Sequence, residues 1–465
     1  MARSVAIGAA VPREAVRRAD PLAGVALGGL VALGALLAVG TAARPSFLVP
    51  PSRAGFPDWL AGPFHGLASF LPHDAAALNY GFSGLLAAML ACYVVVVARA
   101  WSVPVVWGLG AIGVLYAVFL LAPPQLYTDA LTYLDYARLG ALHGLNPYAH
   151  FPAAVPTDPT YAFSSWHHLV SPYGPAFTLL TYPLAGLGVP AAYWTLRAVT
   201  VAASLCALAL VWRAAERWGR PPLPAVLLVG LNPLVLVYGI GGAHNDAFVV
   251  LALAAGAAGL AAGRPARGAA ALVVAGAVKL SALAVLPFAL VGAERRRRAV
   301  VGAAVAAGAL AAVWLGVFGL HGPELRAQAR LETSLSVQSL TGFALGLGGA
   351  TDGVRTAFQV GLGVALAALL VATWRGRPWL TMAGWGMLAV VVSLSWQMPW
   401  YVAWVLPLAA LAGDRRLRWA TVALSAYLLV ALAPATGYLL DRCRCGPSHT
   451  TLGRAQLHEM RTLLH

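Results

Sequence analysis

Polar residues with catalytic potential are concentrated in one interval, residues 123–175, of an otherwise apolar chain. The interval contains four histidines and three aspartates, Asp129, Asp135 and Asp158. A carboxylate placed among other polar groups can act as a general base that takes a proton from a hydroxyl group. A second explanation is open for Asp129, because an acidic residue in the first turn of a helix is favoured by the helix dipole.

A helix over residues 128–143 is expected to present Asp129. Four residues have the spacing of one helical face: Asp129, Tyr133, Tyr136 and Gly140. We expect an amphipathic helix that lies at the membrane surface. Asp135 and Arg138 are three residues apart on this helix and are expected to form an ion pair.

Two short motifs follow this helix. Gly144-Leu-Asn-Pro-Tyr148 predicts a turn, because Pro147 cannot continue a helix. Ser171-Pro-Tyr-Gly-Pro175 leads back into an apolar segment. Their polar side chains, Asn146, Tyr148 and Tyr173, are candidates for binding sugar hydroxyl groups.

Charged and polar residues also occur at two unusual places further along the chain. Gly241-Gly-Ala-His-Asn-Asp246 opens an apolar span, where His244, Asn245 and Asp246 could bind substrate or simply cap the helix. Lys279 lies inside an apolar run. A charge near the bilayer centre costs roughly 2.5–3.5 kcal/mol, so Lys279 requires a partner or a water-filled cavity unless it snorkels to an interface. An anionic phosphate is one such partner.

Weaker signals come from two later segments. Gln338 lies in the outward loop 319–354, and Ser395-Trp-Gln-Met-Pro-Trp-Tyr401 opens an apolar span. Gln338, Trp400 and Tyr401 are further candidates for binding substrate. Aromatic residues at such positions commonly anchor a helix at the membrane interface, so they could be structural.

Composition places these residues in a membrane protein. The 465 residues are 60% hydrophobic and only 10% charged, whereas a soluble domain has about 25% charged residues. Apolar runs of the length needed to cross the hydrocarbon layer recur throughout, without the alternation of a β-barrel. We predict an all-α, polytopic bundle of about 11–13 membrane helices. The expected spans are 22–40, 80–98, 103–121, 190–212, 222–240, 244–262, 299–318, 355–374, 378–394, 399–413 and 418–438, with 173–188 and 268–291 as shorter or interrupted segments.

The arginines predict the orientation of the bundle. The net charge of +15 comes largely from arginines in short turns, which indicates contact with the cytoplasmic face rather than with nucleic acid. All arginine turns reach one side only if 173–188 and 268–291 each return to the side they came from. Loops 43–79, 122–172 and 319–354 then face outward, and the active site is expected on the extracytoplasmic side of the plasma membrane.

We therefore divide the chain into three parts: residues 1–100 with an N-terminal cytoplasmic segment, two spans and an outward loop; residues 101–440 as the catalytic membrane domain; and residues 441–465 as a tail. Nucleotide-binding and zinc-protease motifs are absent. Cys443 and Cys445 have no accompanying ligands with zinc spacing. We predict no cofactor and no metal requirement.

The order of the motifs resembles that of the GT-C class of membrane glycosyltransferases. It is most similar to the actinobacterial polyprenol-phosphate-mannose-dependent α-(1→6)-mannosyltransferases of lipomannan assembly. The resemblance covers roughly residues 100–435 and includes D-x-x-x-Y…R, G-x-N-P-Y, S-P-Y-G-P, G-G-A-H-N-D, V-K and P-W-Y. It implies an inverting transfer of mannose from a polyprenyl-phosphate donor to a glycolipid or oligosaccharide acceptor, within the membrane lipid.

By motif position, the resemblance makes Asp129 the base. Members of the family often have a second carboxylate beside this aspartate, whereas this chain has Thr128 there, so a mechanism with a single base is expected. We expect Tyr133 and Arg138 to shape the site, and Lys279 and His244 to hold the phosphate. The alternatives are a transferase of another lipid-linked sugar, such as arabinose or glucose, and a transporter or flippase of a lipid-linked sugar.

Overall fold

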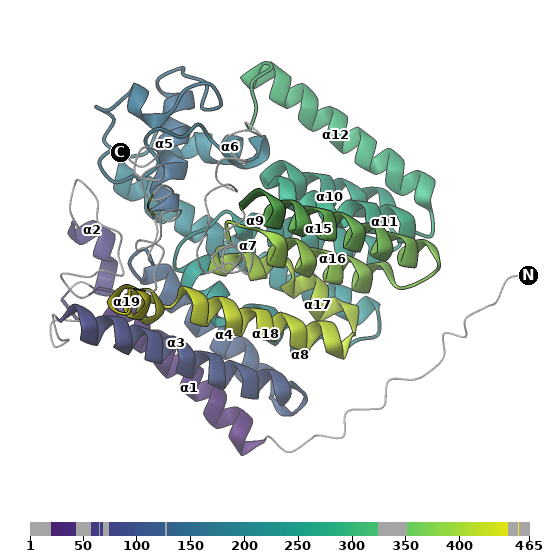
Figure 1. Ribbon diagram of the computed structural model, residues 1–465, viewed down its shortest axis with the longest axis horizontal. Coiled ribbons are helices and arrows are strands. Elements are labelled where there is room, and N and C mark those ends of the chain that lie inside the picture. The colour runs from purple at the N-terminus through teal and green to yellow at the C-terminus, as the bar shows by residue number, and fades with distance from the viewer. Residues whose placement is uncertain are drawn as a thin grey trace, which may run out of the picture.

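The computed structural model of the protein is a bundle of helices (Figure 1). It describes residues 20–42, 57–64, 66–67, 74–125, 128–323, 351–444 and 454. Over these residues the chain forms α-, 3₁₀- and π-helix and no β-strand. The prediction of an all-α polytopic bundle is confirmed.

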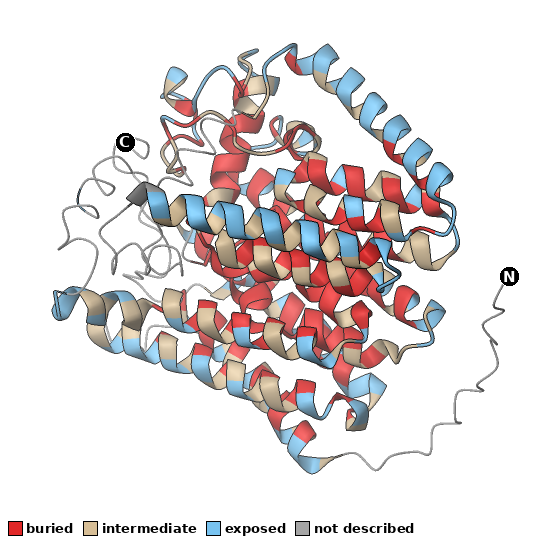
Figure 2. Ribbon diagram, turned by 45° about the vertical axis from the view of Figure 1, so that its right-hand side comes forward, coloured by how far each residue is buried: buried red, intermediate tan, exposed pale blue. Residues whose placement is uncertain are grey.

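Five helices are long and apolar enough to cross a membrane, and a sixth span results if α18 and α19 count as one. The five are α1 (Pro21–Gly40), α3 (Ala75–Ala98), α7 (Val189–Arg217), α12 (Arg296–Phe318) and α15 (Thr351–Trp374). α18 (Arg415–Leu432) and α19 (Pro434–Arg442) meet at a bend of 48°. The faces of α12 that point away from the bundle are exposed (Figure 2), as expected for helices whose solvent is lipid.

The other apolar segments fold as shorter or interrupted helices, so helix length supports fewer complete spans than the 11–13 predicted. The segment predicted at 222–240 forms α8 (Pro222–Gly230) and the π-helix η5 (Val235–Ile240), with Pro233 between them. The segment at 399–413 forms the 3₁₀-helix η7 (Pro399–Trp404) and α17 (Leu406–Ala412). α4 (Val105–Leu121), α9 (Asp246–Ala261) and α16 (Trp379–Ser393) are continuous but short.

The arginine-rich turns meet at one end of the bundle. Gly413 packs against Arg220, and Gly292 packs against Trp379, which brings turns from different parts of the chain together. α10 (Pro265–Val278) ends before Lys279, and η6 (Leu280–Val285) and α11 (Leu286–Gly292) follow it. Ala269, near the start of α10, and Ala293, directly after α11, belong to one cluster of buried residues. The segment at 268–291 therefore returns to the end from which it started, which is the arrangement that the arginine distribution favours.

Short helices and loops cover the other end. They are α2 (Asp58–Ala61), η1 (Gly62–Phe64), α5 (Asp129–Ala141), η3 (Pro152–Ala154), α6 (Pro175–Thr181) and η4 (Tyr182–Leu184), while η2 (Ala100–Ser102) lies in the turn between α3 and α4. The predicted helix that starts near Asp129 is present as α5. However, nine of its 13 residues are buried, so α5 is enclosed by the loops after it and does not lie on the surface with one polar face exposed.

Candidate active site

A strained turn between η5 and α9 positions the polar residues of the G-G-A-H-N-D motif. Ala243 has φ 52°, in the left-handed region that residues with a Cβ atom rarely adopt. A side chain at Gly241 would overlap the carbonyl of Val237, and one at Gly242 would overlap the carbonyl of Tyr238. The two glycines let the backbone fold tightly enough to point His244 back toward α5.

The side chain of Arg197 holds this turn in place through a hydrogen bond to Gly241. Its buried guanidinium donates hydrogen bonds to the carbonyl of Gly241 at 2.8 Å, to the carbonyl of Leu120 at 3.0 Å and to the Tyr193 hydroxyl at 2.8 Å, and it also contacts the carbonyl of Phe119. Arg197 was not predicted as a site residue. Its signal was a charge inside the apolar span 190–212, where a buried arginine must find carbonyl or acidic partners.

Asp129 is the first residue of α5 and lies opposite the turn. Its Oδ1 accepts a hydrogen bond from the Tyr173 hydroxyl at 3.2 Å, and its Oδ2 lies 3.5 Å from His244 Nε2. Burial raises the pKa of the Asp129 carboxyl, but the hydrogen bond and charge of His244, the charge of Lys279 and the Tyr173 hydroxyl outweigh it, so the net shift lowers the pKa. Asp129 is therefore ionised at neutral pH, and its side chain keeps 16% of its exposure.

Contacts on both sides orient the ring of His244. Its Nδ1 lies 2.6 Å from the carbonyl of Tyr238, and a carbonyl can only accept, so Nδ1 carries a hydrogen. Its Nε2 faces the Asp129 carboxylate. Trp400 stacks on this ring at 3.6 Å between centroids and holds its plane in place.

Two tyrosines, Tyr133 and Tyr173, lie beside Asp129. The rings of Tyr133 and Tyr173 meet edge to face at 4.7 Å, and the Tyr133 hydroxyl accepts a hydrogen bond from the backbone N–H of Asn245 at 3.4 Å. Tyr136 also contacts Tyr173, at 6.1 Å between centroids. The face of α5 predicted from the spacing of Asp129 and these tyrosines is confirmed.

Lys279 and the buried Asp246 form an ion pair in which the lysine is partly exposed. Lys279 Nζ lies 2.9 Å from Asp246 Oδ1, and Trp404 Nε1 donates to the same oxygen. The ammonium also lies 4.5 Å from the ring centroid of Tyr401 and 4.8 Å from that of Trp404, a cation–π arrangement. The partner that Lys279 required is therefore a carboxylate of the chain itself. Trp404 was missed, although it follows the predicted Trp400 by one helical turn.

Two polar atoms of the motif are buried without a hydrogen-bond partner in the described part of the chain. Asn245 Nδ2 and Asp246 Oδ2 make no hydrogen bond to any residue that the structure describes, and both side chains are about 1% exposed. An unpaired buried polar group costs about 1–3 kcal/mol. A sugar hydroxyl group could donate to the carboxylate oxygen and accept from the amide.

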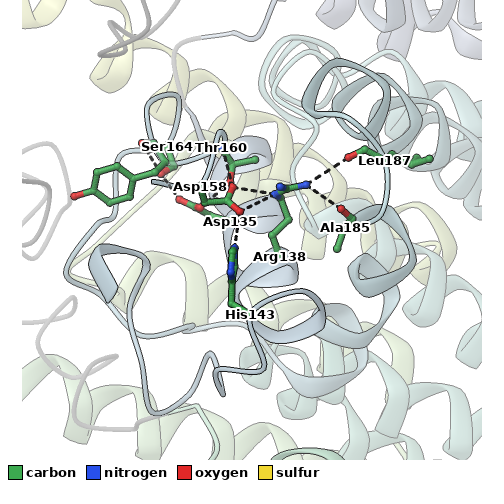
Figure 3. A network of polar contacts seen from close by, with 9 residues as sticks. Asp135, Arg138, His143, Asp158, Thr160, Ser164, Ala185 and Leu187 are labelled. Atoms are coloured by element: carbon green, nitrogen blue, oxygen red, sulfur yellow. Dashed lines mark hydrogen bonds and ion pairs between the residues drawn. The ribbon is translucent and has the colours of Figure 1, made fainter. Parts of the chain in front are cut away.

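A second polar network lies on the opposite side of α5 (Figure 3). Arg138 Nε donates to both carboxylate oxygens of Asp158, at 2.9 and 3.0 Å, and His143 Nε2 lies 2.7 Å from Asp158 Oδ2. The predicted Asp135–Arg138 pair is therefore wrong, because the loop after α5 places the carboxylate of Asp158 within hydrogen-bond distance of Arg138 and His143. The Asp135 carboxyl instead lies 2.8 Å from the Thr160 hydroxyl and contacts that of Ser164.

The two carboxyl groups of this network have opposite pKa shifts. Burial raises the pKa of the Asp135 carboxyl to about 6, with the charge of Asp158 adding to the effect. Burial also acts on Asp158, but its hydrogen bonds from Arg138, His143 and Thr160 prevail and lower its pKa to about 2. The hydrogen bonds of this network hold the loop after α5 against the helix. The network is separate from the residues around Asp129.

The remaining predicted site residues have supporting positions or cannot be placed. Asn146 Nδ2 donates to the carbonyl of Phe318 at 2.8 Å, so Asn146 ties its turn to the end of α12. The Tyr148 hydroxyl donates to the carbonyl of Tyr173 at 2.8 Å and thereby orients the residue that contacts Asp129. Gln338 lies outside the residues that the structure describes.

The fold and the site define a polytopic helical membrane protein with a partly exposed carboxylate beside a histidine, a largely buried ion pair and several surrounding aromatic rings. A family model described as the N-terminal domain of α-(1→6)-mannopyranosyltransferases matches residues 22–295, and one described as the MptB C-terminal domain matches residues 332–443. The chain belongs to this family of mannosyltransferases and is a glycosyltransferase.

Relatives with known names agree with the family match. The chain is 33% identical over 358 residues to α-(1→6)-mannopyranosyltransferase A of Mycobacterium tuberculosis, covering 68% of each chain. It is 30% identical over 148 residues to a probable α-(1→6)-mannopyranosyltransferase of Mycolicibacterium smegmatis, covering 30% of this chain and 26% of that one. No solved structure matches the chain.

Proposed function

We propose that the protein transfers a mannosyl unit from polyprenyl-phosphate mannose to a mannan or glycolipid acceptor, with inversion, on the outer face of the plasma membrane. One observation carries the choice of base. Asp129 is ionised and has no lysine or arginine partner among the described residues, and its side chain is 16% exposed. Asp246, the other carboxylate of the site, is paired with Lys279 and only 2% exposed.

The proposed reaction is a single displacement at the anomeric carbon of mannose. The acceptor hydroxyl oxygen forms the new bond to this carbon as the bond from the carbon to the phosphate oxygen breaks. Asp129 takes the hydroxyl proton, and polyprenyl phosphate leaves with the bonding electron pair. A positioned base contributes typically 10²–10⁴-fold to such a rate. The pKa of Asp129 is lowered, so the group is in the ionised form that a base requires.

Two groups near Asp129 would stabilise the leaving phosphate. His244 is held by Tyr238 and Trp400 with its Nε2 toward the site, and the ammonium of Lys279 lies against the rings of Tyr401 and Trp404. Groups that are already oriented need no rearrangement as charge develops on the leaving oxygen. Asn245 and Asp246 each have an unpaired polar atom for sugar hydroxyl groups.

Purified protein in detergent, synthetic polyprenyl-phosphate mannose and a short mannoside acceptor test this proposal. Asp129→Asn should lower transfer at least 100-fold and leave the yield of folded protein unchanged. Asp135→Asn is the matched control, because it makes the same change on the far side of the same helix and should retain most of the activity. Turnover of Asp129→Asn within tenfold of the unmodified protein would refute the role of Asp129.

The same assay tests the other parts of the proposal. Linkage analysis of the product distinguishes an α-(1→6) bond from others, and its anomeric configuration reports inversion or retention. Parallel reactions with polyprenyl-phosphate arabinose and glucose test the donor. Transfer in detergent, where no compartments exist, would be inconsistent with a protein that only transports a lipid-linked sugar.

A further inference from the structure

A cleft of about 660 Å³ lies at the arginine-rich end of the bundle, between the turn from α11 to α12 and the turn from α15 to α16. Its charged and aromatic lining consists of Glu294, Arg296, Arg377, Trp374 and Trp379. The opposite end of α12 contacts Asn146, so about 35 Å of helix separates the cleft from the end of the bundle that contains Asp129. The volume is within the range of about 300–1,000 Å³ that is typical of ligand pockets.

The charge of the cleft favours an anion. Arg296 and Arg377 are exposed and form no ion pair with any residue in the described part of the chain, and neither does Glu294. The lining therefore has a net positive charge, and the arginines adjacent in sequence, at positions 295, 297, 298 and 375, increase the local potential. Guanidinium groups bind phosphate oxygens through charge-assisted, often bidentate hydrogen bonds.

The surroundings of the cleft favour a lipid over a soluble anion. Trp374, at the last turn of α15, is 73% exposed, and tryptophans at such positions lie at the level of the headgroups. An exposed apolar face continues from it along α15, where Val371, Val364 and Val360 are 48%, 65% and 60% exposed. These valines share one helical face. A phosphate in the cleft would thus have acyl chains against the adjoining helix.

We propose that this cleft is a binding site for the phosphate group of an anionic phospholipid. Arg296 and Arg377 donate hydrogen bonds to the phosphate oxygens from the two turns, and Trp374 and Trp379 flank the headgroup. The acyl chains lie along the valine face of α15. The site is distinct from the one that holds the transferase residues, and it does not depend on the identity of the sugar donor.

Native mass spectrometry of the full-length protein, released from micelles that contain phosphatidylglycerol or phosphatidylcholine, tests this proposal. The unmodified protein should retain one phosphatidylglycerol molecule more tightly than any phosphatidylcholine. The double variant Arg296→Gln/Arg377→Gln should bind phosphatidylglycerol at least tenfold more weakly. The matched control Arg415→Gln/Arg416→Gln removes the same charge from exposed positions on another turn and should bind it as the unmodified protein does.

Three results would overturn the proposal: undiminished binding by the Arg296/Arg377 variant, equal loss by both double variants, or complete displacement of the lipid by millimolar inorganic phosphate. The last would identify the cleft as a site for a soluble anion. If the double variant does not fold, the single change Arg377→Gln on the exposed turn provides the same comparison. It should weaken binding several-fold, and unchanged binding would again contradict the proposal.

Discussion

Replacing Asp135 by Asn should change how the stability of the protein depends on pH. Thr160 Oγ1 lies 2.8 Å from Asp135 Oδ1 and 2.5 Å from Asp158 Oδ1, but a hydroxyl has one proton and can donate it to only one of them. Asp158 is ionised and held by Arg138. A proton on Asp135 resolves the conflict, because Asp135 can then donate to Thr160 while Thr160 donates to Asp158.

The size of the effect follows from the shifted pKa. The pKa of Asp135 is raised from 3.8 to about 6 in the folded protein. The folded state therefore binds the proton more tightly, and stability falls as pH rises from about 4 to above 6. At 1.36 kcal/mol per pKa unit the total loss is about 3 kcal/mol, of which about half falls between pH 5 and 7.5. The stabilisation from Asp158, whose pKa is lowered to about 2, is lost only below about pH 4 and does not interfere.

Unfolding free energies in detergent, measured at pH 5 and pH 7.5 for the unmodified protein and for Asp135→Asn, test this reasoning. The asparagine keeps an acceptor oxygen but cannot ionise, so its stability relative to the unmodified protein should increase by about 1.5 kcal/mol from the lower to the higher pH. Glu294→Gln, the same kind of change at an exposed position, serves as the control. An Asp135→Asn difference that is independent of pH, or that decreases with pH, would refute the assignment of the proton to Asp135.

Two further substitutions test the supports of the site. Arg197→Met should remove the hydrogen bonds to the Tyr193 hydroxyl and to the carbonyls of Leu120 and Gly241, and lower the free energy of unfolding by about 3 kcal/mol or more. Thermal unfolding measures this, and a loss below about 1 kcal/mol would contradict it. Lys279→Met should cost about 3–5 kcal/mol because Asp246 keeps a buried charge. The double variant Lys279→Met/Asp246→Asn should recover part of that loss, and a double variant that is no more stable than the single one would argue against the pair.

Much of the fold follows from sequence patterns because apolar length and arginine placement are local properties. The segment at 268–291 illustrates both, since Lys279 interrupts its apolar run and arginines flank both ends. The break in 222–240 falls at Pro233, a signal that the sequence contains. The tight turn after this segment was not predictable in the same way, because Arg197 from another helix holds the carbonyl of Gly241.

The residue types of the site were recognisable in the sequence, whereas their pairings were not. Asp129, His244 and Lys279 stand out as polar groups in apolar surroundings, and the structure brings them together. The partner of Arg138 was predicted from helical spacing and proved to be Asp158, 20 residues away along the chain. Trp404 reaches Asp246 across 158 residues, a separation over which spacing carries no information.

The environments of the aspartates near α5 also narrow the choice of base. Asp135 is buried, and the hydroxyl groups of Thr160 and Ser164 occupy its oxygens, so an incoming hydroxyl group cannot reach it. Asp158 is ionised, but Arg138 and His143 occupy its oxygens. Asp246 is ionically bound to Lys279. Of these four aspartates, only Asp129 has both a lowered pKa and a partly exposed side chain. A base that takes a proton from an incoming hydroxyl group requires both.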